Sequence, residues 1–160
     1  MSAMESNTGN RNVSRVAIGS DHASYEAKEI IKSYLTCVGY KIVDVGTNDS
    51  TTKVDYPDFA VAVSKKVTSG DCDRGIMLDS AGIGSSMVCN KVNGIRAALC
   101  WNTKTIMNSR EHNNANVLTM GTLNHKADEL CSMAKLWLET GFEGGRHWVR
   151  INKMMSVEKK

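Results

Sequence analysis

The stretch RGIMLDSAGIGSSMVCNK, from Arg74 to Lys91, decides the fold. The apolar run at residues 75–78 predicts a buried strand, and residues 85–91 are compatible with a helix. Between them, Gly82 and Gly84 form a turn that directs backbone N–H groups toward an anion. Asp79 stands where the strand ends, the position at which open α/β sheets bind ligands. A G-x-G turn also occurs without any ligand, so the rest of the chain has to decide.

Strands and helices alternate along the whole chain. Further strands are predicted at residues 16–19, 41–45, 95–100 and 116–120, and helices at residues 25–38, 57–67, 102–110, 126–139 and in the tail at 144–150. Such alternation is typical of a parallel sheet covered on both faces. The sequence therefore predicts an α/β protein: a Rossmann-like three-layer αβα sandwich with a five-stranded parallel sheet and right-handed crossovers.

The composition indicates one globular domain. The chain has 160 residues, of which 41% are hydrophobic, and a net charge of +3 that is too small and too dispersed to indicate nucleic acid or a membrane surface. We expect residues 1–14 to be a disordered leader without a signal-peptide core, and residues 15–160 to be the domain. The five cysteines form no C-x-x-C pair, which favours reduced thiols and a cytoplasmic protein.

Several kinds of chemistry lack their sequence signatures. No His or Cys spacing indicates a metal site, no serine has the G-x-S-x-G frame, and the nucleotide-binding fingerprints are incomplete. We therefore expect no metal and no cofactor. What remains is acid/base chemistry on a small anion, with Asp21-His22, residues 79–84 and His112-Asn113 meeting at one rim of the sheet. Asp21 has an alternative interpretation as a helix-capping residue.

Six separate motifs carry a resemblance to a known family. They are GSDHA at residues 19–23, DYPD at 55–58, GIG at 82–84, NKVNGIRAA at 90–98, SREHNNANV at 109–117 and GGRHWVR at 144–150. With these motifs, the stretch from Val16 to Arg150 resembles the ribose-5-phosphate isomerase B family, which includes the galactose-6-phosphate isomerase subunits. The resemblance implies a cofactor-independent aldose–ketose isomerase acting on a sugar phosphate.

The resemblance also implies a role for each matching residue. Asp21 would hold the ring oxygen or hydroxyls of the sugar, and His112 would help to open its ring. The substrate-binding residues would be His22, Tyr56, Ser80, Gly82, Gly84, Asn113, Arg146 and Arg150. Arg146 and Arg150 would clamp the phosphate across a subunit interface, so the resemblance implies a homodimer or tetramer with a shared active site.

The sequence departs from the family pattern in the loop after Asp79. Asp79 occupies the place of the family's catalytic cysteine, and Ser80 and Ala81 replace a glycine and a threonine. Ser85 stands where one branch of the family has a catalytic glutamate, and Leu123 stands where a phosphate-binding arginine is usual.

Three hypotheses follow from the resemblance and these departures. The first is isomerisation of ribose 5-phosphate to ribulose 5-phosphate through an enediolate, with Asp79 as the base and N–H groups of residues 82–84 stabilising the enediolate oxygen. The second is isomerisation of another sugar or sugar phosphate. The third is a binding protein that has kept the fold and lost the activity.

Overall fold

A computed structural model gives the structure of the protein and describes residues 12–158. The described residues contain a five-stranded sheet in the order β2-β1-β3-β5-β4. All neighbouring strands are parallel, with β1 in register with β3 from Val16↔Arg74 to Ser20↔Leu78. The strands are β1 (Arg15–Ser20), β2 (Lys41–Asp44), β3 (Arg74–Asp79), β4 (Ala97–Leu99) and β5 (Val117–Gly121). The predicted α/β sandwich with a parallel five-stranded sheet is confirmed.

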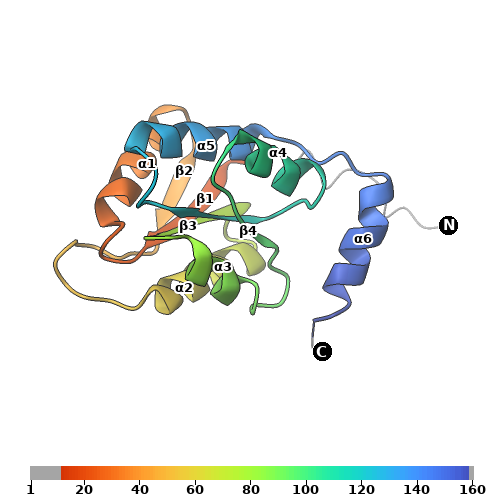
Figure 1. The fold of residues 1–160 in the computed structure, drawn as a ribbon, viewed down its shortest axis with the longest axis horizontal. Coiled ribbons are helices and arrows are strands. Elements are labelled where there is room, and N and C mark those ends of the chain that lie inside the picture. The colour runs from red at the N-terminus through yellow and green to blue at the C-terminus, as the bar shows by residue number, and fades with distance from the viewer. Residues whose placement is uncertain (1–11, 159–160) are drawn as a thin grey trace.

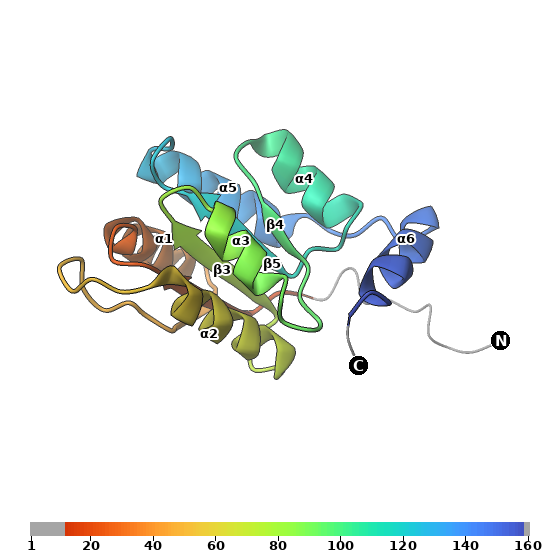
Figure 2. The ribbon, with the colours of Figure 1, turned by 60° about the horizontal axis from the view of Figure 1, so that its bottom comes forward.

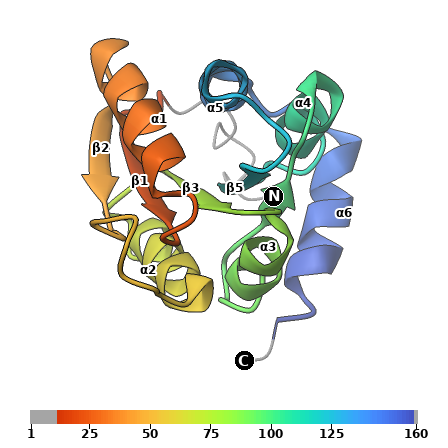
Figure 3. The same ribbon diagram turned by 60° about the vertical axis from the view of Figure 1, so that its left-hand side comes forward.

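Helices cover both faces of this sheet (Figures 1 and 3). One layer consists of α1 (Tyr25–Cys37), α4 (Thr103–Glu111) and α5 (Ala127–Glu139), and the other of α2 (Tyr56–Thr68) and α3 (Ile83–Cys89). Alternate strand residues point to opposite faces, so Ile18 and Ile76 belong to the core under α1 and α5, whereas Ala17 and Met77 belong to the core under α2. The last helix, α6 (Arg146–Met155), lies outside the two layers, beyond the edge strand β4 (Figure 2).

Some predicted boundaries differ from those in the structure. Helix α3 begins at Ile83, two residues early, because Gly82 adopts a left-handed conformation with φ of 74° and serves as its N-cap. Strand β4 is shorter than predicted, and the Arg96 N–H binds the Asn116 side chain at 2.7 Å. Most of the predicted leader lies outside the described residues. Its last residue, Ser14, is held by the Asp73 carboxylate at 2.9 Å.

The strand order places the carboxyl ends of β1 and β3 where open α/β sheets have their ligand-binding crevice. The chain leaves β1 toward β2 on one side and returns to β3 on the other, which makes this the topological switch point of the sheet. The loop after β2 closes one wall of the crevice, since the Ser20 N–H donates to the Gly46 carbonyl at 2.9 Å. Asp44 accepts the Gly46 N–H at 2.9 Å and holds that loop in place. In the described part of the chain, no helix has the length and apolar character needed to cross a bilayer.

Candidate active site

The predicted site residues fall into two groups. The carboxyl-edge cluster consists of Asp21, His22, Tyr56 and the loop 79–84, and it lines the crevice at the switch point. The amino-edge cluster consists of His112, Asn113, Arg146 and Arg150, which follow helix α4 or belong to α6.

Asp79 ends strand β3 and is only 6% exposed. One carboxylate oxygen accepts the Ala81 N–H at 2.9 Å and also the Gly82 N–H. The other accepts the N–H of Ser85 at 3.0 Å and its hydroxyl at 2.5 Å. Asp79 therefore organises the loop between β3 and α3, and the Gly82 N–H that we expected to face the substrate is instead bound to this carboxylate.

Asp21 and His22 occupy the first turn after β1. The Asp21 carboxylate accepts the Ser24 N–H at 3.0 Å, which is the capping interaction considered as the alternative interpretation of the sequence. The Val54 N–H donates to His22 Nδ1 at 3.2 Å. Because Nδ1 acts as an acceptor, the neutral His22 ring carries its hydrogen on Nε2, where it is available as a donor to an anion.

Two glycines let the loop approach its neighbours closely. A Cβ on Gly82 would lie 2.8 Å from the backbone N of Gly121, and one on Gly84 would lie 2.5 Å from the Tyr56 ring. The predicted pocket residue Tyr56 therefore packs directly on Gly84. Larger side chains at either glycine would displace the β5 backbone or this tyrosine.

The loop after β5 also reaches the carboxyl-edge cluster. The Leu123 N–H donates to the Ser80 carbonyl at 3.1 Å, and the Thr122 hydroxyl lies 2.9 Å from that of Ser24. The Leu123 side chain is 74% exposed although it is apolar. The position at which the resemblance implied an arginine therefore lies beside the loop that carries Asp79 and Ser80.

The amino-edge cluster lies where β4 and β5 begin. The Arg96 Nε–H, just before β4, donates to the Asn113 carbonyl at 3.2 Å. Asn108 Nδ2 lies 2.9 Å from His112 Nδ1, and Asn113 Nδ2 donates to Asn108 Oδ1 at 3.1 Å. Asn108 thus orients both predicted site residues from one turn earlier in helix α4.

Arg146 and Arg150 lie on the first turns of α6. They are four residues apart, which puts them on the same face of the helix. Both side chains are exposed, and no carboxylate among residues 12–158 forms an ion pair with either. Two exposed guanidinium groups on one helix face are suited to binding a phosphate.

The predicted meeting of His112 and Asn113 with Asp21-His22 and residues 79–84 at one rim is wrong for a single chain. His112 and Asn113 follow a helix that runs back against the strands, so they lie near the start of β5, whereas Asp79 lies beside its end. The four residue steps of β5 correspond to about 13 Å, several times the reach of a hydrogen bond. One chain therefore carries two separated halves of the predicted site.

The sequence analysis assigned no role to three residues that contact the amino-edge cluster. Asn108 has no motif of its own, and Glu143 and His147 received no role although His147 belongs to the quoted GGRHWVR motif. Glu143 Oε2 lies 3.6 Å from His112 Nε2 and 3.5 Å from His147 Nε2. The spacing of Asn108 four residues before His112 was the only available signal for its contact with that ring.

Comparison with known proteins identifies the family. A family model described as Ribose/Galactose Isomerase matches residues 16–154. A putative sugar phosphate isomerase of Bacillus subtilis is 42% identical over 91% of this chain and 98% of its own, and ribose-5-phosphate isomerase B of Escherichia coli is 34% identical over 91% and 97%.

A solved structure indicates the same family. Ribose-5-phosphate isomerase B of Clostridium thermocellum superposes with a TM-score of 0.87 and 43% identity, covering 89% of this chain and 96% of that one. The similarity spans both clusters and nearly the full length of each relative. The chain therefore belongs to the Ribose/Galactose Isomerase family and is an aldose–ketose isomerase of that family.

Proposed function

We propose that the protein interconverts ribose 5-phosphate and ribulose 5-phosphate, with Asp79 as the base. The observation that carries this proposal is the position of Asp79, a buried carboxylate at the end of β3 in the switch-point crevice. Removal of the C2 proton by Asp79 gives an enediolate. Return of that proton to C1, with transfer of a proton from O2 to O1, gives the ketose.

The hydrogen bonds of Asp79 specify how it would act. Four donors occupy its oxygens, and three of them are backbone N–H groups held by the loop. The Ser85 hydroxyl is the fourth and is the donor that can rotate away. Rotation of this O–H would free a lone pair on the carboxylate for the C2 proton. The N–H groups of Ile83 and Gly84, in the first turn of α3, would then be the loop donors for the enediolate oxygen, in place of Gly82.

We further propose that two chains assemble each active site, as a homodimer or a tetramer of such dimers. The separation of the two clusters supports this, since neither edge of one chain holds both Asp79 and His112. A groove of about 1180 Å³ lies between β4 and α6 beside the amino-edge cluster, with Asn108, Asn113, Trp101 and Met154 in its wall. Trp101 and Met154 are 57% and 46% exposed, which suits burial by a second copy.

In the assembled site His112 of one chain would open the sugar ring held by Asp21 of the other. Arg146 and Arg150 would bind the phosphate, with His22 donating from its Nε2. This arrangement requires neither a cofactor nor a resident metal ion. The free state of all five cysteines supports the reducing environment of the cytoplasm as its location.

Leu123 favours a second candidate substrate. An exposed leucine beside Ser80 cannot bind phosphate as an arginine would, and Ala81 offers no hydroxyl. A sugar that makes fewer polar contacts at this loop would suit these residues. The second candidate is therefore isomerisation of a different pentose, tetrose or hexose, with or without phosphate.

The test compares the wild type with Asp79→Asn and Ser85→Ala. We expect the wild type to convert ribose 5-phosphate and to exchange the C2 hydrogen in heavy water, as followed by NMR. Asp79→Asn should lose activity by a factor on the order of 10³, whereas Ser85→Ala keeps the base and should stay within about tenfold of the wild type. Thermal melting of each variant checks that it is folded.

Other outcomes separate the hypotheses. Full activity in folded Asp79→Asn would exclude Asp79 as the base. Conversion of another sugar, with ribose 5-phosphate unchanged, would establish the second candidate. Stabilisation by sugar phosphates with no turnover of any of them would identify a binding protein.

A further inference from the structure

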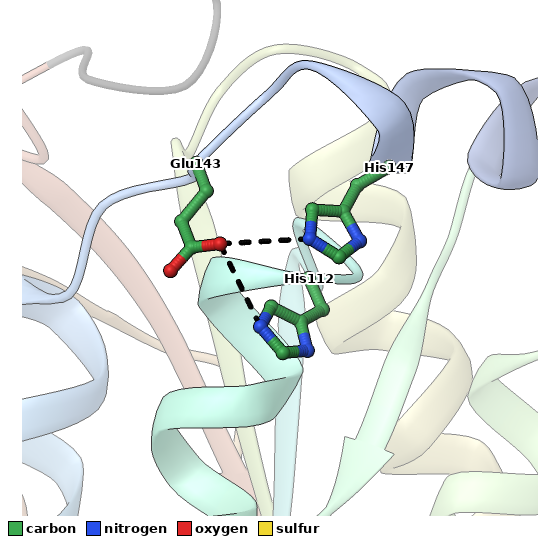
Figure 4. A group of neighbouring side chains, drawn as sticks. All are labelled: His112, Glu143 and His147. Carbon is green, nitrogen blue, oxygen red and sulfur yellow. Dashed lines mark ion pairs between the residues drawn. The ribbon is translucent and has the colours of Figure 1, made fainter.

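His112, Glu143 and His147 form a compact group outside the crevice (Figure 4). Their possible ligand atoms all lie within 4.8 Å of one another. Both imidazoles present Nε2 to the same carboxylate oxygen, at 3.6 Å for His112 and 3.5 Å for His147. The two rings are stacked, with centroids 4.3 Å apart and planes 11° from parallel.

Two backbone features and the burial of His147 bring these side chains together. The Glu143 N–H donates to the carbonyl of Glu111 at 3.0 Å, which ties the tail to the end of α4 next to His112. Gly144 and Gly145 then adopt left-handed conformations with φ of 70° and 56° and turn the chain back into α6. His147, in the first turn of that helix, is 4% exposed and therefore fixed in place.

We propose that this group binds a divalent transition-metal ion, for which Zn²⁺ is the appropriate probe. Two imidazole nitrogens and one carboxylate oxygen are a donor set suited to zinc, cobalt or nickel and unsuited to magnesium or calcium. Two ligands each about 2.1 Å from a tetrahedral ion lie about 3.4 Å apart, close to the two nitrogen–oxygen distances here. Because the stacked rings hold their Nε2 lone pairs in nearly parallel planes, binding requires the partly exposed His112 ring to tilt toward the ion. Three protein ligands leave a fourth position open to water or to an oxygen of a bound sugar.

The surroundings support a cation at this position. Asn108 contacts the other nitrogen of His112, as an outer-shell residue does when it fixes the orientation of a metal-binding imidazole. The end of α4 near His112 favours positive charge and the start of α6 near His147 opposes it, so the two helix dipoles largely offset each other. The carboxylate of Glu143 supplies the negative charge within the group.

Such an ion would inhibit the enzyme. This step rests on the proposed function, in which His112 opens the sugar ring. A metal ion bound to Nε2 removes the nitrogen that would exchange a proton with the sugar. We therefore expect reversible inhibition by zinc, because the same histidine cannot bind an ion and open the ring at once.

Binding can be tested without any reference to activity. Co²⁺ is titrated into full-length protein without a histidine tag, and its visible absorption is followed for the wild type, Glu143→Gln, His147→Asn and the control His125→Asn. The control removes a histidine that lies 3.8 Å from a single carboxylate, Glu129. We expect one cobalt ion per chain in the wild type and the control, and at least a tenfold loss of affinity in the other two variants.

Any of three results of this titration would overturn the proposal, and the first two concern binding itself. One is the absence of any cobalt absorption, and the other is unchanged binding in His147→Asn. A thiolate-to-cobalt charge-transfer band would place the ion on a cysteine such as the exposed Cys37 and would also overturn it.

A second experiment measures sugar turnover in the presence of Zn²⁺ and again after addition of excess chelator. Each variant is compared with its own metal-free rate. We expect inhibition of the wild type that the chelator reverses, and at least a tenfold weaker inhibition of Glu143→Gln. Cobalt binding without zinc inhibition would refute the inhibitory role of the site. Failure of the wild type to turn over any sugar would refute the proposed function, and the cobalt titration would still decide the metal site.

Discussion

At the scale of single residues, neighbours determine what each polar side chain can do. Asp79 and Arg110 are both almost fully buried, yet their surroundings differ. Four donors satisfy the Asp79 carboxylate, whereas the acceptors of the Arg110 guanidinium among residues 12–158 are neutral. The carboxylate can be rearranged through the Ser85 hydroxyl, and no carboxylate of the described residues pairs with the guanidinium.

The first prediction concerns Leu123. Replacing this exposed residue by arginine should add a charge-assisted contact to a phosphate bound beside Ser80. Because such a hydrogen bond contributes about 1.5–3 kcal/mol, we expect KM for ribose 5-phosphate to fall by about tenfold or more. Steady-state kinetics provide the measurement.

Leu123→Gln is the matched control, since it is polar without a charge. It should leave KM within about threefold of the wild-type value, because a neutral amide gives the weaker hydrogen bond. An unchanged KM in Leu123→Arg would mean that the phosphate binds elsewhere.

The second prediction concerns Asn114, the neutral partner of Arg110. Asn114 Oδ1 accepts the Arg110 Nη1–H at 2.9 Å, and Nη2 has no partner among the described residues. Burial, together with the charges of Arg74 and Arg96, lowers the pKa of Arg110 to about 9. At neutral pH the arginine is charged in both the folded and the unfolded chain. Burying that charge therefore lowers the free energy of unfolding.

Asn114→Asp should therefore raise the free energy of unfolding at pH 7 by about 1–3 kcal/mol. Asn114 has a positive φ of 45°, which aspartate also tolerates. In the folded protein, Arg110 would lower the pKa of the new carboxyl below its unfolded value of about 3.9. The increase in the free energy of unfolding is therefore complete above about pH 3.9, and it is lost as the pH falls through the pKa of the carboxyl in the folded protein. Urea unfolding from pH 7 down to pH 3 measures this.

Asn114→Ala is the control, and it should destabilise the protein because Arg110 loses an acceptor. No gain from Asn114→Asp at pH 7 would mean that the neutral acceptors already compensate the charge.

At the scale of secondary-structure elements, helix α6 carries two functions on its first two turns. Its exposed arginines are proposed to bind phosphate, and His147, about 100° around the helix from Arg146, is buried in the contact with Glu143 and His112. The glycine turn before the helix makes both orientations possible. The element thus joins the two proposed phosphate-binding arginines to the contact with His112.

We predict that Arg146→Ala and Arg150→Ala each raise KM for ribose 5-phosphate by about tenfold or more, because each loses a charged hydrogen bond to the phosphate. Arg146→Lys should recover part of the loss, since it keeps the charge without the planar fork. Steady-state kinetics with each variant measure the effect.

Lys65→Ala is the control, because Lys65 is an exposed cation on the distant helix α2. It should behave as the wild type. Equal changes in KM for a sugar with and without phosphate would exclude a specific phosphate contact by the arginines.

At the scale of the whole molecule, the two clusters lie at opposite edges of one sheet. A shared active site then predicts complementation between variants that are each inactive. Asp79→Asn and His112→Ala damage different halves of each site, so a mixed dimer has one site with both defects and one with neither. Random exchange at equal amounts gives half mixed dimers, and the activity should recover to about a quarter of the wild-type value.

The measurement is turnover after the two variants are unfolded together and refolded. Each variant refolded alone should remain inactive, and size-exclusion chromatography should show the same oligomer in all samples. If the mixture remains inactive although mixed oligomers form, both residues act within one chain.

The sequence by itself determined the layered sheet and the residues of the carboxyl-edge cluster. Short apolar runs, glycine turns and Pro57 are local signals, and strands that alternate with helices have few ways to form a parallel sheet. Asp79 was predicted at the end of β3 because the strand signal and the turn signal are adjacent in the chain.

Only the tertiary structure decided where His112 lies and what surrounds it. The return direction of α4 places this residue at the opposite edge of the sheet from Asp79, and the tail brings Glu143 and His147 to it from more than thirty residues further along the chain. The Thr140 carbonyl that accepts the Arg110 Nε–H likewise comes from a segment distant in sequence. Such contacts depend on the packing of whole elements, and no local pattern of residues encodes them.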